Sequence, residues 1–239
     1  PSSPISGDVI VYGTPVTVKV ETATVSISPS PATIDVGQSV EFTATVANGV
    51  GTASYQWYES TTSSSSGFTA ISGATSPTYM FTPSSAGTYY INVTVTLTPS
   101  SPISGDVIVY GTPVTVKVET ATVSISPSPA TIDVGQSVEF TATVANGVGT
   151  ASYQWYESTT SSSSGFTAIS GATSPTYMFT PSSAGTYYIN VTVTLTPSSS
   201  PISGDVIVYG TPVTVTVDSD PTVSISPSTS QTMDVGQSI

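Results

Sequence analysis

The chain is built from an internal repeat. Residues 1–98 recur unchanged as residues 99–196, and residues 197–239 begin a third copy with one added serine at 198–200 and an altered end. A repeat of this length is too long for one turn of a solenoid, and it matches a whole small domain. The sequence therefore predicts a tandem array of separately packed domains.

Within each copy, the alternation of apolar and polar residues predicts strands. In residues 88–97, Tyr89, Ile91 and Val93 alternate with polar residues, which is the period of a half-buried strand. Thr and Val dominate these runs, and branched side chains favour the pleated surface of a sheet. Turn signals separate about seven runs per copy, as in an immunoglobulin-like sandwich. The predicted fold class is all-β, with tandem immunoglobulin-like β-sandwiches arranged in a rod.

The chain has two tryptophans, Trp57 and Trp155, one in each full copy. Each lies in the middle of the segment Ser-Tyr-Gln-Trp-Tyr-Glu-Ser, at residues 54–60 and 152–158. A tryptophan in a half-buried strand needs a large apolar site, and it supplies much of the burial that a small β domain achieves. We therefore predict that Trp57 and Trp155 are core anchors, and that two tryptophan strands mark two complete domains.

The boundary of the repeat differs from the boundary of the predicted domain. Residues 13–21 (GTPVTVKVE) alternate like a last strand, and the first strand of a new domain follows without a gap. The predicted complete domains are residues 22–120 and residues 121–218. Residues 1–21 are then the last strand of a preceding domain, and residues 219–239 are the first strands of a following one.

Charge and composition exclude several classes of function. The net charge is −12, and Lys19 and Lys117 are the only basic residues, so a nucleic-acid groove is excluded, because phosphate binding depends on Lys and Arg. The chain has no His and no Cys, which excludes disulfides, zinc and haem sites, and mechanisms that use an imidazole or a thiolate. No apolar run is long enough to insert into a membrane. We expect no enzyme activity, no cofactor and no metal site.

Three carboxylates recur in each unit, and in the first unit they are Asp35, Glu41 and Glu59. Two of them meeting would form a glycosidase pair, but we interpret all three as solvated strand and turn residues. The predicted junctions offer oxygen ligands for calcium, such as Glu119 and Asp218. The DxDxDG-type spacing of a calcium loop is absent, so no junction ion is expected.

Three stretches resemble prokaryotic Ig-like surface repeats and their PKD-like relatives. They are residues 28–40, which end in Asp-Val-Gly-Gln-Ser-Val, residues 55–58 (YQWY), and residues 81–89, where Ala-Gly-Thr-Tyr leads into the long strand. The resemblance implies that Tyr89 and Tyr187 are corner tyrosines that anchor the core beside the tryptophans. The acidic Asp-Gly motif of PKD domains is absent, which favours Ig-like repeats over PKD proper. Such repeats occur in archaeal and bacterial surface layers, adhesins, stalks and filaments.

Two sequons offer sites for glycan attachment. Residues 92–94 and 190–192 both read Asn-Val-Thr, which matches the N-x-[ST] acceptor pattern of extracellular proteins. Asn92 and Asn190 lie on the face of their strands opposite the apolar residues, so we predict that both side chains are exposed. Short sequons also arise by chance, and a plain polar strand residue is the alternative interpretation.

The segment between the predicted domains, residues 119–122, contains no Gly or Pro, so we expect a stiff connection. Each domain would add roughly 40 Å of length, from strands of about ten to twelve residues. The predicted function is a structural component of an extracellular filament or cell-surface stalk, as a segment of a longer array of near-identical repeats. The expected partners are copies of itself, joined head to tail by strand donation or within one continuous chain, with glycans as further candidates.

The ends of the chain bear on how such an array is joined. Residues 1–21 and 219–239 together lack the middle strands of a sandwich, which favours a segment of a long array over strand donation between subunits. The alternative function is an adhesin or carbohydrate-binding surface module that uses loops 60–67 and 99–106. Both functions predict an extracellular or cell-surface location and no insertion into the membrane.

Overall fold

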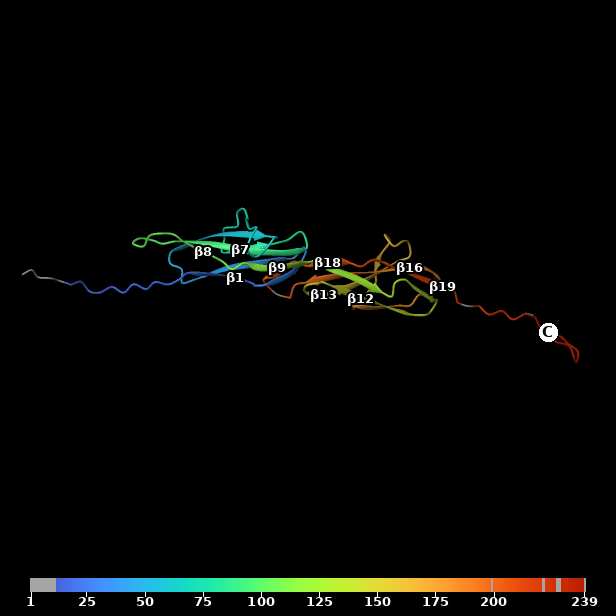
Figure 1. Cartoon of the computed structure of the whole chain (residues 1–239). Coiled ribbons are helices and arrows are strands. Elements are labelled where there is room, and N and C mark those ends of the chain that lie inside the picture. Colours follow the sequence, from blue (N-terminus) through green and yellow to red (C-terminus); the bar gives the residue numbers. More distant parts are fainter. Residues whose placement is uncertain (1–11, 199, 221, 227–228, 239) are drawn as a thin grey trace, which may run out of the picture.

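The computed structural model describes residues 12–198, 200–220, 222–226 and 229–238. It consists of two β-sandwiches that lie end to end (Figure 1). The predicted class of tandem immunoglobulin-like β-sandwiches is confirmed. Among the described residues, no helix has the length and apolar character needed to cross a membrane.

The strands of the first sandwich are β1 (Thr24–Ser28), β2 (Ala32–Asp35), β3 (Ser39–Ala47), β4 (Thr52–Ser60), β5 (Thr69–Ala70), β6 (Thr78–Phe81), β7 (Gly87–Thr98), β8 (Val107–Tyr110) and β9 (Val114–Glu119). Those of the second are β10 (Thr122–Ser126), β11 (Ala130–Asp133), β12 (Val138–Ala145), β13 (Thr150–Ser158), β14 (Thr167–Ala168), β15 (Thr176–Phe179), β16 (Gly185–Thr196), β17 (Ile202–Ser203), β18 (Val206–Tyr209) and β19 (Val213–Asp218). Among the described residues, β17 pairs with β3 of the first sandwich. In the described part of the chain each sandwich otherwise has nine strands, because the first and last predicted strands are each divided and a short strand, β5 or β14, is added.

Each sandwich pairs a small sheet with a larger one. The small sheet of the first sandwich has the order β1-β3-β6, and the larger one has the order β2-β9-β7-β4-β5, with β8 also paired to β7. The first predicted strand crosses from one sheet to the other, since β1 pairs with β3 whereas β2 runs parallel to β9. Pro29 and Pro31 lie at the crossing, where they lack the N–H group that a continuous ladder would need. The second sandwich repeats this arrangement.

The core lies between the two sheets of each sandwich. Trp57 is fully buried beside Phe42, Ile91 and Val93. The indole Nε1–H of Trp57 donates a hydrogen bond to the carbonyl of Ser76 (2.8 Å), so the one polar group of the ring is satisfied inside the core. The same side chains pack in the same way around Trp155 in the second sandwich.

The described residues outside the two sandwiches form no strand. Residues 16–21 have the same sequence as β9, yet Val16, Val18 and Val20 are exposed. The reason is that β9 is held between β2 and β7, whereas no described strand pairs with residues 16–21. Residues 222–226 repeat the sequence of β1 and likewise form no strand. The part of the predicted last strand that falls on residues 1–11 lies outside the described residues.

We predict that Trp57→Ala lowers the free energy of unfolding of the first sandwich by about 3–5 kcal/mol, the usual cost of deleting a buried tryptophan. Because the chain has only two tryptophans, the fluorescence of Trp155 in this variant reports on the second sandwich alone. Thermal or denaturant unfolding should show early loss of the first sandwich while Trp155 emission stays native. An equal loss of stability in both sandwiches would contradict separate cores.

Candidate functional site

A tight turn at the end of β2 forms one half of the contact between the two sandwiches. We call residues 35–38 the DVGQ turn. The Gln38 N–H donates to the carbonyl of Asp35 (3.0 Å), and the Asp35 N–H donates to Oε1 of Gln38 (2.9 Å). Gly37 has a φ of 96°, which is the left-handed conformation that glycine adopts at the third position of such a turn.

Val148 of the second sandwich is held by both side chains of this turn. The Val148 N–H donates to Oδ2 of Asp35 (2.7 Å), and Nε2 of Gln38 donates to the Val148 carbonyl (2.9 Å). Val148 lies in the loop between β12 and β13, where Asn146 and Gly149 both have positive φ. The two hydrogen bonds satisfy both the backbone N–H and the backbone carbonyl of Val148. We call this pair of bonds the clamp.

A second contact extends the small sheet of the first sandwich. Strand β17 pairs antiparallel with the start of β3, with Ile202 opposite Val40 and Ser203 opposite Ser39. The Glu41 N–H also donates to the carbonyl of Pro201 (3.0 Å). A loop of the second sandwich therefore adds a short strand to an edge of the first, and it covers backbone groups that would otherwise face water.

The two copies of the DVGQ turn show what docking changes. Asp35 and Gln38 are fully buried at the junction, whereas Asp133 is half-buried and Gln136 is exposed in the undocked copy. The internal bond from the aspartate N–H to the glutamine Oε1 is nevertheless present at Asp133 (3.0 Å). The turn is thus formed before it docks, so little conformational entropy is lost when it binds its partner.

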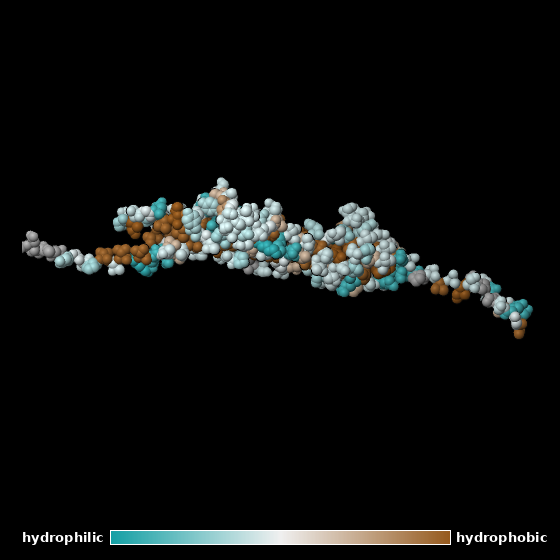
Figure 2. Space-filling view, in the orientation of Figure 1, coloured by the Kyte–Doolittle hydropathy of each residue, from teal (hydrophilic) through white to brown (hydrophobic). Residues whose placement is uncertain are grey.

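The other half of the junction also differs between the copies. In the first sandwich, where this end is undocked, Val50, Ile103 and Val107 are 60%, 57% and 52% exposed. Their counterparts Val148, Ile202 and Val206 are half-buried at the junction. Figure 2 shows apolar residues gathered at the end of the first sandwich next to the N-terminal segment. Docking therefore removes apolar surface from water, which is favourable.

Burial of the Asp35 carboxylate gives the junction a charge that is poorly compensated. Burial raises the pKa of Asp35, the Val148 N–H opposes that rise, and the negative charge of Glu119 adds to it. Among the described residues, Oδ1 of Asp35 has no hydrogen-bond partner. The interpretation of Asp35 as a solvated turn residue is wrong, because the neighbouring sandwich covers it. No group of three acidic, His or Cys side chains that would hold a metal ion occurs in the described part of the chain.

We predict that the junction becomes more stable as the pH falls. The pKa of Asp35 in the docked state lies above its ordinary value of 3.8, so folding takes up a proton there. The stabilisation is complete below pH 3.8 and is lost as the pH rises through the raised pKa. Asp35→Asn keeps an acceptor oxygen for Val148 and should flatten this dependence of the unfolding free energy of the first sandwich.

Asp133→Asn is the matched control for this experiment, because it makes the same substitution in the undocked turn. Denaturant titrations of both variants across the acidic range, followed by tryptophan fluorescence, measure the difference. Equal pH profiles for the two variants would show that docking does not perturb Asp35.

The residues predicted as anchors lie away from the junction. Trp57 and Trp155 are fully buried in the two cores. Tyr89 and Tyr187 pack against these cores, and each hydroxyl donates to a backbone carbonyl four residues upstream, at Ser85 and Ser183 (3.0 Å in both). The structure does not bring the anchors together into a site, and the two pairs of residues serve separate sandwiches.

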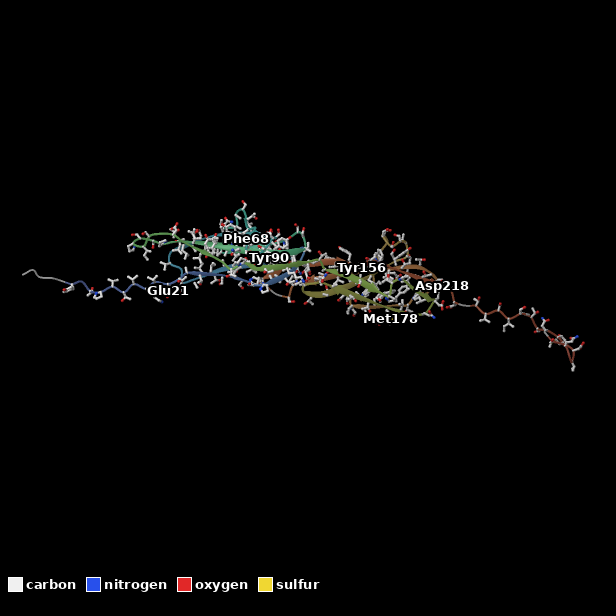
Figure 3. All side chains as sticks on the ribbon, viewed as in Figure 1. Glu21, Phe68, Tyr90, Tyr156, Met178 and Asp218 are labelled. Atoms are coloured by element: carbon white, nitrogen blue, oxygen red, sulfur yellow. The ribbon has the colours of Figure 1, made fainter. Side chains whose placement is uncertain are left out.

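The two sequon asparagines lie on the outer face of the larger sheets. Asn92 on β7 and Asn190 on β16 are half-buried, so both are less exposed than the sequence predicted. In the second sandwich, Asn190 lines a cleft of about 230 Å³ together with Tyr156, Phe166, Thr192 and Tyr209. Figure 3 labels Tyr156 of this cleft and Phe68, which is the counterpart of Phe166 in the first sandwich. The cleft is more apolar than its position on a polar sheet face would lead one to expect.

The clamp was not predicted from the sequence. Gln38 and Val148 were not singled out, and loop 99–106 was assigned to adhesion, although its counterpart at 197–205 contributes β17 to the junction. One signal was present in the sequence. The Asn-Gly-Val-Gly turn places a valine where polar residues prevail, although a single apolar residue on a surface does not by itself indicate a contact.

Comparison with known proteins agrees with the two-sandwich structure. The sequence model of a family described as "PKD domain" matches residues 22–104 and 120–208. The resemblance to tandem Ig-like repeats with PKD-like relatives is confirmed. The preference for Ig-like repeats over PKD proper is wrong, because the family match covers most of each sandwich although the acidic Asp-Gly motif is absent.

One curated protein and several solved structures are similar to the chain. The "highly immunogenic outer capsid protein" of Enterobacteria phage T4 is 29% identical over 185 residues, which is 74% of this chain and 45% of that protein. The chain thus spans less than half of that relative. The human KIAA0319 PKD domain is 25% identical, covering 44% of this chain and 88% of the domain, with a TM-score of 0.32. The four N-terminal Ig domains of Dscam1 isoform 4.44 are 14% identical, covering 85% and 48%, with a TM-score of 0.29.

Proposed function

Since the chain belongs to the PKD domain family, we propose that it is a structural segment of an extracellular filament or cell-surface stalk. In this function, stacked β-sandwiches form a rod and each sandwich fixes the orientation of the next. The observation that carries the proposal is the clamp, in which the side chains of Asp35 and Gln38 bind both backbone groups of Val148. A flexible string of domains has no need for such a contact.

The repeat supplies both halves of the clamp in each sandwich. The first sandwich carries an undocked Asn-Gly-Val-Gly loop at residues 48–51, and the second carries an undocked DVGQ turn at residues 133–136. A further sandwich of the same sequence would therefore dock at either end by the same two hydrogen bonds. Repeating one junction with one geometry generates a regular array of domains. The proposed partners are consequently further copies of this domain, joined head to tail.

The clamp is better suited to repetition than β17 is. The loop that contains β17 has one serine more than loop 99–106, which is the corresponding loop of the first sandwich. The residues of the clamp are identical in both copies. The orientation of successive domains thus rests on the part of the junction that does not vary, and the loop adjusts the edge contact.

We predict that Gln38→Ala loosens the junction while leaving both sandwiches folded. The substitution removes the bond to Val148 and the bond from the Asp35 N–H, and each such bond contributes about 0.5–1.5 kcal/mol. Small-angle X-ray scattering should show a shorter mean end-to-end distance than in the wild-type chain. Amide hydrogen exchange at Val148 should become faster.

Gln136→Ala is the control, because Gln136 makes the same internal bond to the Asp133 N–H but lies at the undocked end. It should leave the scattering curve unchanged. If both glutamine variants give the same curve, the clamp does not hold the two sandwiches in line, and the proposed structural function loses its main support.

A second candidate function is an adhesive or carbohydrate-binding surface module. The aromatic cleft around Tyr156, Phe166 and Tyr209 favours it, since aromatic faces and neutral polar groups are common in ligand sites. Electron microscopy of the native material separates the two functions. Long uniform fibres support the structural proposal, whereas dispersed short rods that bind glycans support the adhesive one.

A further inference from the structure

The cleft on the outer face of the second sandwich contains a whole sequon. Asn190 and Thr192 lie two residues apart on β16, so their side chains point to the same side of the sheet. Across the sheet, Asn190 is opposite Tyr156 on β13, and Thr192 is opposite Tyr209 on β18. Phe166 closes the cleft from the loop before β14.

The amide of Asn190 is held with one group free. Its Oδ1 accepts a hydrogen bond from the N–H of Val191 (2.8 Å). Its Nδ2 donates no hydrogen bond to any of the described residues. Gly210 leaves room for this amide, because a Cβ at that position would lie 3.0 Å from Oδ1 of Asn190. Asn190 lines the cleft, and the nitrogen that a glycan would use is not hydrogen-bonded to any of the described residues.

The lining of the cleft suits a sugar ring. Three aromatic side chains provide apolar faces for the C–H groups of a pyranose, and Thr192 provides a neutral hydrogen-bonding group. The volume of about 230 Å³ lies below the range of about 300–1,000 Å³ for pockets that take drug-sized ligands. A single ring fits this description better than an extended oligosaccharide does. Tyr209 is 69% exposed, which leaves surface for such a ring to cover.

We propose that Asn190 carries an N-linked glycan whose first sugar packs in this cleft against Tyr156, Phe166 and Tyr209. The bond forms between Nδ2 of Asn190 and the anomeric carbon of a lipid-phosphate-linked saccharide. The bond from that carbon to the phosphate oxygen breaks, Nδ2 loses a proton, and the lipid phosphate leaves. This inference rests on the proposed extracellular location. The first sandwich repeats it at Asn92, where Tyr58 is opposite Asn92 and Tyr110 is opposite Thr94.

Mass spectrometry can detect modification at the two sequons separately, because they fall in peptides of different mass. Cleavage after acidic residues releases residues 60–106 and residues 158–205, each with one sequon, and the second peptide is longer by one serine. In protein isolated from its own cells, both peptides should carry an added saccharide mass. Enzymatic release in heavy-oxygen water should convert Asn190 to a labelled aspartate. An unmodified 158–205 peptide would overturn the proposal.

Variants made in the same cells test the chemistry of attachment. Thr192→Val should abolish modification of the 158–205 peptide, and Thr192→Ser should restore it. Thr194→Val, on the same strand face but outside the sequon, should leave the modification unchanged. Loss of the saccharide in Thr194→Val but not in Thr192→Val would overturn the assignment of the sequon.

The packing of the first sugar needs a variant that keeps the sequon. Tyr209→Ala should retain the glycan and speed its enzymatic release several-fold, because one wall of the cleft is removed. An unchanged rate would overturn the packing. If Asn190 is unmodified and the chain binds chitohexaose through Tyr209, the cleft serves an external glycan and the proposal fails. A chain with unmodified Asn190 and a rigid junction would refute this inference alone and leave the proposed structural function intact.

Discussion

The alignment of the two sandwiches depends on Val148, whose backbone groups exchange hydrogen bonds to water for hydrogen bonds to Asp35 and Gln38. In the first sandwich, the equivalent Val50 is exposed, so its backbone groups face water. At the junction, the same groups bond to Asp35 and Gln38. Each exchanged bond contributes only about 0.5–1.5 kcal/mol, and burial of the Asp35 carboxylate opposes docking. The two bonds therefore orient the junction, while the pairing of β17 with β3 and the apolar surface removed from water stabilise it. The covalent link adds to this by holding the two halves at high effective concentration.

A junction that orients its neighbour is suited to a long array. The DVGQ turn has the same internal bond whether it is docked, as at Asp35, or undocked, as at Asp133. Docking therefore orients the neighbouring sandwich without reshaping the turn. Because each sandwich presents a turn at one end and an Asn-Gly-Val-Gly loop at the other, a sandwich within the proposed array would have to match two neighbours. Identical copies meet this condition, since a change in either half would require a compensating change in the adjacent domain.

The sequence was sufficient for the fold but not for the junction. Period-two alternation and two tryptophans identify the strands and the cores, because burial inside a sandwich repeats along each strand. The burial of Asp35 has a different origin, since its partner Val148 is more than a hundred residues away. An aspartate before Val-Gly in a turn is normally solvated, and only the neighbouring sandwich makes it otherwise. The cleft around Asn190 was missed for a different reason, because the order and register in which β13, β16 and β18 pair bring its lining together within one sheet.

The three kinds of contact occupy separate surfaces of the sandwich. The inner faces of the sheets pack around tryptophan, the loops at the two ends form the clamp, and the outer face of the larger sheet carries the aromatic cleft. Asn190 is on the central strand β16, next to Val191 of the core. It belongs neither to the DVGQ turn nor to the Asn-Gly-Val-Gly loop. A glycan on this face leaves the end loops uncovered. The same domain can therefore stack on its neighbours and present a modified side to its surroundings, which is the combination that a surface stalk requires.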